Sequence, residues 1–127
     1  MLSAGFSLVD AEVKASGAAV SLDGLRPAQT PRLTFSSTLA WHPENGPRAS
    51  LTARYVSGQY EDDLNSRLLR GAFTMDATAS FPLMKRLAIE ARAENLLDQR
   101  VEAGVTGDGI VERATPRTLW IGLRLNR

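Results

Sequence analysis

The sequence predicts an all-β fold: about six antiparallel amphipathic strands in an up-and-down meander that forms part of a transmembrane β-barrel. Apolar and polar residues alternate with a period of two along most of the chain, which is the spacing of a two-faced strand. The connections between the alternating segments are in turn long and short. No uncharged apolar run approaches the roughly 18 to 20 residues that a transmembrane helix needs, so helical spans are excluded.

Composition narrows the functional classes. The 127-residue chain has 15 Lys and Arg against 14 Asp and Glu, a net charge of +1, so no overall field favours nucleic acid as a partner. It has no cysteine, which excludes disulfides, thiolate nucleophiles and zinc–thiolate sites. The single histidine, His42, lies between Trp41 and Pro43, where we expect a turn rather than a metal site. We therefore expect no cofactor, no metal and no nucleic-acid partner.

The first segment, residues 2–13, alternates least regularly. One parity is shared by Leu2, Ala4, Phe6 and Leu8, and the other by Val9, Ala11 and Val13. A bulge near Val9, which adds one residue to a strand, would explain the change. Residues 1–6 lack the basic and apolar regions of a secretory signal, so we expect an exported protein to need sequence upstream.

The later segments alternate more cleanly. In residues 32–41 the odd positions are mostly apolar and the even positions mostly polar, and the same parity holds for residues 49–60, 69–81 and 87–93. It also holds for residues 118–125, where only Trp120 interrupts the polar face. Residues 86–97 are rich in Ala, Leu, Glu and Arg, which favour helix. Their apolar positions fall at i, i+2, i+4 and i+6, however, and we therefore predict a strand.

The connections form a second pattern. Residues 42–47 and 82–85 are short and rich in turn residues, whereas residues 14–31, 61–68 and 98–116 form longer gaps. Tight turns on one side and longer loops on the other are typical of an outer-membrane barrel, whose short turns face the periplasm. Both ends of the chain would then lie in the periplasm. Residues 104–109 are rich in glycine but precede a strand, so we interpret them as a mobile extracellular loop rather than a phosphate site.

Alternation alone does not tell whether the apolar face meets lipid or a protein core, so a soluble β-barrel or sandwich binding module stays open as the alternative. Two features favour the membrane. Trp41 and Phe81 lie at strand ends beside short turns, where aromatic residues mark a membrane interface. The apolar face also contains many alanines, which alone fill a soluble core poorly: Ala49, Ala53, Ala77, Ala79, Ala91 and Ala93.

Strand number adds a constraint. Six strands are fewer than the roughly eight of the smallest closed outer-membrane barrels. An open sheet would leave unpaired edges in lipid, which are not tolerated. We therefore expect a part of a larger barrel, or a unit that pairs with other chains.

Four segments then follow one another in a specific order. Residues 30–33 place a proline ahead of a strand, and residues 54–65 end a strand in a Tyr- and Asp-rich stretch. Residues 114–125 form a strand that a Pro-Arg pair introduces. Between them stands the most specific motif, which consists of Glu94, Asn95, Leu96, Leu97 and Asp98. From about Leu25 onward, the chain resembles the end of a TonB-dependent receptor barrel.

This resemblance implies that residues 1–127 are the C-terminal portion of such a barrel, with the plug domain and the earlier strands outside the sequence. It implies a receptor and transport segment in the outer membrane of a Gram-negative cell, for TonB-dependent uptake of a scarce ligand of the ferric siderophore or cobalamin class. The implied partners are outer-membrane lipid, the remainder of the barrel with its plug, and the small-molecule ligand of the full receptor. TonB would be contacted only through the N-terminal part. The resemblance does not imply an enzyme.

Two groups of polar residues could have a function. Glu90, Arg92 and Glu94 form a charged ladder on one strand, and the same polar side would also carry Arg54, Asp76 and Arg124. The ladder is either a lumen wall that contacts a plug or a solvated lattice of ion pairs, and we favour the lattice. Paired carboxylates could support glycosidase chemistry, but nothing nearby would distinguish an acid from a base, so we expect no catalytic residues.

The second group is an acidic stretch in a long connection, made of Tyr60, Glu61, Asp62, Asp63 and Asn65. Its oxygen atoms could in principle bind calcium. The glycine and the closing glutamate of an EF-hand loop are missing, however. We interpret the stretch as a solvated extracellular loop.

Overall fold

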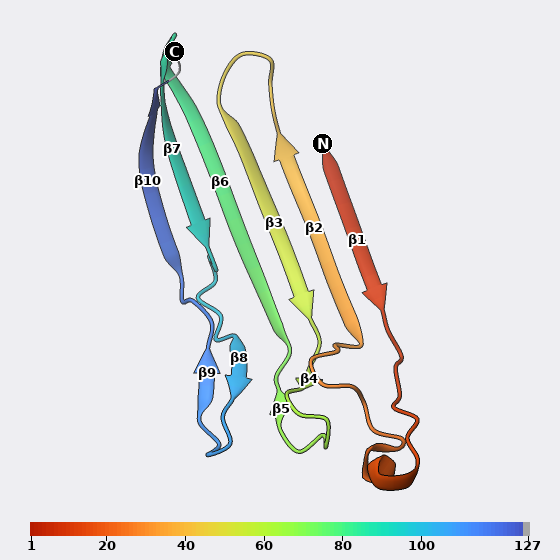
Figure 1. Cartoon of the computed structure of the whole chain (residues 1–127). Coiled ribbons are helices and arrows are strands. Elements are labelled where there is room, and N and C mark those ends of the chain that lie inside the picture. The colour runs from red at the N-terminus through yellow and green to blue at the C-terminus, as the bar shows by residue number, and fades with distance from the viewer. Residues whose placement is uncertain (126–127) are drawn as a thin grey trace.

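The computed structural model describes residues 1–125 and consists mainly of one antiparallel sheet, in which each strand pairs with the next long strand of the chain (Figure 1). The six strands of the sheet are β1 (Leu2–Leu8), β2 (Leu33–Trp41), β3 (Arg48–Val56), β6 (Ala72–Met84), β7 (Leu87–Glu94) and β10 (Thr118–Leu125). The sheet is open, with β1 and β10 as its two edges. The predicted all-β meander of six strands is confirmed.

The register keeps the two faces of the sheet separate from edge to edge. Phe6 lies opposite Phe35, Phe35 opposite Tyr55, and Tyr55 opposite Phe73. This register places four aromatic side chains in one row on the apolar face. On the polar face hydroxyl groups of neighbouring strands meet: Thr38 and Thr52 at 3.0 Å, and Ser50 and Thr78 at 2.6 Å. The strand predicted instead of a helix in residues 86–97 is confirmed for residues 87–94, as β7.

The connections alternate between long and short along the chain, as the sequence predicts. Tight turns join β2 to β3 and β6 to β7 at one end of the sheet, and three longer connections lie at the other end (Figure 1). Each longer connection has structure of its own. The first contains the 3-10 helix η1 (Gly17–Leu22). The second contains the hairpin of β4 (Gln59–Tyr60) and β5 (Leu68–Leu69), and the third contains the hairpin of β8 (Glu102–Val105) and β9 (Val111–Arg113).

Two local predictions are wrong. The pairing of β1 with β2 runs without a shift from Leu2 to Leu8, so the strand ends where a bulge near Val9 was expected. β6 continues to Met84, because Pro82 and Met84 accommodate a register shift within the strand, and the turn is confined to Lys85 and Arg86. Residues 104–109 include the end of β8 and the tip of the β8–β9 hairpin, where Gly109 has φ +80°.

The sheet has almost no core. Among residues 1–125 the buried residues are Ala40, Leu69, Ala88, Asn95 and Gly104, and no large side chain is fully buried. The apolar face is exposed, with Phe6, Ile121 and Leu123 at 80%, 78% and 71%. A soluble barrel or sandwich would bury these side chains, and within the described residues nothing covers them. No helix in this part of the chain is long and apolar enough to cross a membrane.

Candidate functional site: a charged wall and a loop network

Six charged residues of the polar face form three ion pairs. Arg54 of β3 contacts Asp76 of β6 at 3.1 Å, and Arg124 of β10 contacts Glu90 of β7 at 2.9 Å. The third pair, Arg92 with Glu94, lies along β7. All six side chains are partly exposed, and pairs of this kind contribute about 0 to 1 kcal/mol each. The geometry is that of an ion-pair lattice on a polar wall.

Trp120 is an apolar residue within this polar wall, and its contact with Arg92 accounts for its position there. The two residues lie opposite each other in the β7–β10 register, and the guanidinium carbon lies 5.5 Å from the centre of the indole ring. A cation above the face of an aromatic ring is attracted by the ring's π electrons. A groove of about 550 Å³ adjoins the pair, with His42, Arg48 and Thr78 among its lining residues. The groove combines an aromatic surface with charges and hydroxyl groups.

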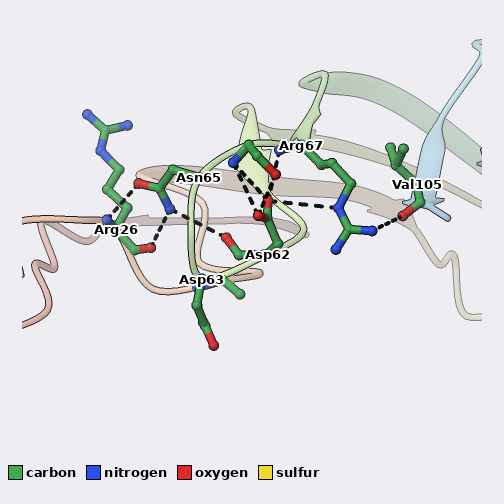
Figure 2. Close-up of polar contacts among 8 residues, drawn as sticks. Arg26, Asp62, Asp63, Asn65, Arg67 and Val105 are labelled. Carbon is green, nitrogen blue, oxygen red and sulfur yellow. Dashed lines mark hydrogen bonds and ion pairs between the residues drawn. The ribbon is translucent and has the colours of Figure 1, made fainter. Parts of the chain in front are cut away.

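Asp62 fixes the conformation of the acidic loop (Figure 2). Its carboxylate accepts hydrogen bonds from the Ser66 hydroxyl at 2.6 Å and from the backbone N–H groups of Ser66 and Arg67 at 3.0 Å and 2.8 Å. The Ser66 hydroxyl is the main reason that the pKa of Asp62 is lowered, and the two N–H groups and the Arg67 charge add to it against a smaller effect of burial. The carboxylate therefore holds a turn together.

Asn65 joins this loop to the first long connection. Its Oδ1 accepts the Arg26 backbone N–H at 2.8 Å, and its Nδ2 donates to the Arg26 carbonyl at 2.7 Å (Figure 2). The backbone of Asn65 is left-handed, with φ +54°, which asparagine tolerates better than most residues. Tyr60 supports the same junction, because its carbonyl accepts the Gln29 N–H at 2.7 Å.

Two arginines join the loop to the third long connection. Arg67 Nη1 donates to the Val105 carbonyl at 3.3 Å (Figure 2), and the Arg70 backbone N–H donates to Glu102 at 2.8 Å. The side chains of Arg70 and Glu102 also approach to 3.8 Å. The three long connections therefore form one hydrogen-bonded network at this end of the sheet.

The remaining acidic residues of the loop do not form a metal site. Asp63 accepts the Ala28 backbone N–H at 3.4 Å, and the buried Oε2 of Glu61 has no hydrogen-bond partner in the part of the chain described. Across residues 1–125 no three Asp, Glu or His residues are grouped so that they could hold a metal ion.

The Glu94–Asp98 motif forms a second junction. Asn95 is 6% exposed and has φ +49°, and its side-chain amide accepts the Gln99 N–H at 2.9 Å and donates to the Gln99 carbonyl at 2.8 Å. Its backbone N–H donates to Asp76 on β6 at 3.0 Å. Asp98 accepts the Arg117 N–H at 3.1 Å, just before β10. The motif thus ties β7 to β6 and β10, a role that its sequence alone does not reveal.

Comparison with known proteins gives a likeness of fold. No family model matches the sequence, and no curated protein matches it. The siderophore receptor PiuA from Acinetobacter baumannii is similar in structure with a TM-score of 0.84 and 16% identity, over 98% of this chain and 19% of the receptor. The ferric citrate transporter FecA is similar with a TM-score of 0.79 and 19% identity, over 98% of this chain and 20% of the transporter. The ferric yersiniabactin uptake receptor FyuA from Yersinia pestis is similar with a TM-score of 0.71 and 22% identity, over 82% of this chain and 17% of the receptor.

These structures define the class of fold. They are outer-membrane receptors with a β-barrel, and this chain has the fold of a segment of that barrel. The resemblance to TonB-dependent receptors is thereby confirmed at the level of the fold. The chain spans about a fifth of the length of the receptors PiuA and FecA, whose chains it covers to 19% and 20%. The structural neighbours are transport receptors and not enzymes.

Proposed function

We propose that the chain is a wall segment of an outer-membrane receptor that takes up a scarce ligand of the ferric siderophore or cobalamin class in a TonB-dependent manner. The observation that carries the proposal is a six-stranded sheet whose apolar face continues from β1 to β10 and stays uncovered within residues 1–125. Lipid would cover the apolar face, because the large side chains exposed there are stable in hydrocarbon. The fold likeness to siderophore receptors supports the ligand class.

The remaining partners follow from the same arrangement. Further strands would pair with the edges β1 and β10, and a plug domain would lie against the charged wall of Arg54, Asp76, Glu90, Arg92, Glu94 and Arg124. The network of long connections would face the outside of the cell. Contact with TonB would be made through an N-terminal part of the receptor.

A pair of arginine substitutions tests which face meets lipid. Ala77 lies on the apolar face opposite Leu51 and Ala93, and Thr52 lies near it on the polar face opposite Asp76. In a complete barrel we expect Ala77→Arg to lower the free energy of unfolding by roughly 2 to 4 kcal/mol, because the charge enters hydrocarbon near mid-strand. Thr52→Arg should cost much less, since a carboxylate lies opposite. Equal losses in a denaturant titration in lipid vesicles would contradict the proposed orientation.

Extraction is the matching test for the chain itself. We expect the native chain to be recovered with membranes or detergent. Recovery in buffer as a monodisperse monomer would contradict the proposal and favour a soluble β-barrel or sandwich module.

A further inference from the structure

The turn between β6 and β7 has an unusual charge for this sheet. It consists of Lys85 and Arg86, and it is the one connection of the five that contains cations and no carboxylate. Each of the other four includes at least one acidic residue, namely Asp10, Glu44, Asp62 and Asp98. The positive charge of the turn is therefore not balanced within the turn itself.

The surroundings do not balance it either. Both side chains are exposed, and none of the ion pairs formed within residues 1–125 includes Lys85, Arg86 or the nearby Arg48. A groove of about 460 Å³ beside the turn brings Lys85 and Arg48 to the same hollow as Glu44, which forms no ion pair with them. Cations in this setting remain available to an anion from outside the chain.

Exposed apolar side chains adjoin the turn. Leu83 and Met84 precede it and are 57% and 74% exposed, and Phe81 is 50% exposed on the same strand. Trp41 is the last residue of β2 and is 58% exposed. Figure 1 shows that β2 ends at the same end of the sheet as the turn between β6 and β7. Transfer of apolar side chains out of water is favourable, whereas the adjacent cations are stable only in water or beside an anion. The boundary between hydrocarbon and lipid headgroups satisfies both.

We propose that the Lys85–Arg86 turn is a binding site for the phosphate of anionic phospholipid headgroups, which holds the tight-turn end of the sheet at the membrane surface. The inference rests on the proposed membrane function and adds the class of lipid. A lipid fits better than a free phosphate ion, because only a lipid also covers Leu83 and Met84. Each cation near an anionic surface strengthens binding about fivefold, and salt screens the effect.

The test uses the whole chain, diluted from detergent into vesicles of phosphatidylcholine, alone or mixed with phosphatidylglycerol. We expect tighter association with the mixed vesicles, and we expect the double substitution Lys85→Gln and Arg86→Gln to weaken that association about 30-fold without changing binding to phosphatidylcholine. The exchange Lys85→Arg with Arg86→Lys should keep the preference. The matched control is Arg100→Gln with Arg113→Gln, which removes two exposed cations at the opposite end and should leave the preference intact.

The outcomes separate this proposal from the membrane function. Equal binding of the unaltered chain to both vesicle types, or an equal loss in the control variant, would overturn the lipid site. Displacement by inorganic phosphate at matched ionic strength would assign the turn to a free anion and would also overturn it. A chain that binds neither vesicle type would contradict the proposed function instead. Circular dichroism of each variant establishes that the strands are intact.

Discussion

Asn95 combines a left-handed backbone with a buried side-chain amide, and few residues satisfy both conditions. The φ of +49° costs an ordinary L-residue roughly 1 to 2 kcal/mol, and the amide forms two hydrogen bonds with the backbone of Gln99. Asparagine lowers the first cost through its short polar side chain and provides both a donor and an acceptor. The residue therefore determines how β7 leaves the sheet.

Substitution of Asn95 should be correspondingly costly. We expect Asn95→Ala to lower the free energy of unfolding by roughly 2 to 4 kcal/mol, because it adds backbone strain and removes both hydrogen bonds between the buried Asn95 amide and the Gln99 backbone. Asn95→Gly should lose about 1 kcal/mol less, since glycine tolerates the positive φ. Denaturant unfolding in detergent measures both. A loss no larger than that of Leu97→Ala, a change at a 53% exposed side chain, would show that the junction is not important.

Asp62 gives the acidic loop a dependence on pH. Hydrogen bonds in the folded loop, first of all from Ser66, lower its pKa below the ordinary value of 3.8. A group with a lowered pKa stabilises the folded state fully above its unfolded value and loses this contribution as the pH falls through the folded value. The loop should therefore keep its structure at neutral pH and loosen only below pH 3.8.

NMR shifts of the Ser66 and Arg67 amide protons should report this titration, because both amides donate to the Asp62 carboxylate. The Asp62→Asn variant is the control, since it keeps an acceptor but does not titrate. Amide shifts that moved at the same pH in both variants would contradict the role of Asp62.

Among the larger elements, the three long connections behave as one unit because side chains of the middle one reach the other two. Asn65 bonds to Arg26 in the first connection, and Arg67 bonds to Val105 in the third. A single hydrogen bond of this kind contributes about 1 kcal/mol, but the bonds act together when each fixes the segment that makes the next.

The variant Asn65→Gly tests this coupling, because it removes the side chain and keeps a residue that accepts φ +54°. We expect hydrogen exchange to speed up roughly fivefold or more at Arg26 and Gln29, consistent with a loss of about 1 kcal/mol or more, while amides of β3 and β6 stay protected. Slower or unchanged exchange at Arg26 would show that the connections are independent.

At this scale, the strands were predictable and their ends were not. Apolar and polar residues alternate with a period of two along β2, β3, β7 and β10, and this alternation predicts which side chains lie on each face. A shift of the register by one residue would move every apolar side chain of a strand to the opposite face. The end of β6 was missed, since Pro82 is a turn residue in most contexts but here lies at a register shift. The network of Asn65, Arg67 and Glu102 was missed because its partners are backbone atoms, which carry no sequence signal.

For the whole molecule, the open sheet creates an imbalance that the chain does not relieve by itself. The edges β1 and β10 each present backbone groups without a strand partner in residues 1–125, and the apolar face is exposed beside them. The meander makes β1 and β10 antiparallel to each other, as closure of a ring requires. Too few strands are present for one copy to bend into a closed outer-membrane barrel, which takes about eight.

The isolated chain should therefore aggregate in buffer and associate through its edges in detergent, with β1 of one copy beside β10 of another. The chain has no cysteine, and a Cβ added at Gly5 of β1 or Gly122 of β10 would meet nothing within 4 Å. Both residues lie on the polar face, so Gly5→Cys combined with Gly122→Cys should form disulfide-linked dimers under oxidation in detergent. Each single variant should form few disulfide-linked dimers, because β1 of one copy does not lie beside β1 of another, and β10 does not lie beside β10. A strand-rich monomer that needs no detergent, with no cross-linking, would show that six strands satisfy their own edges and would favour the soluble barrel.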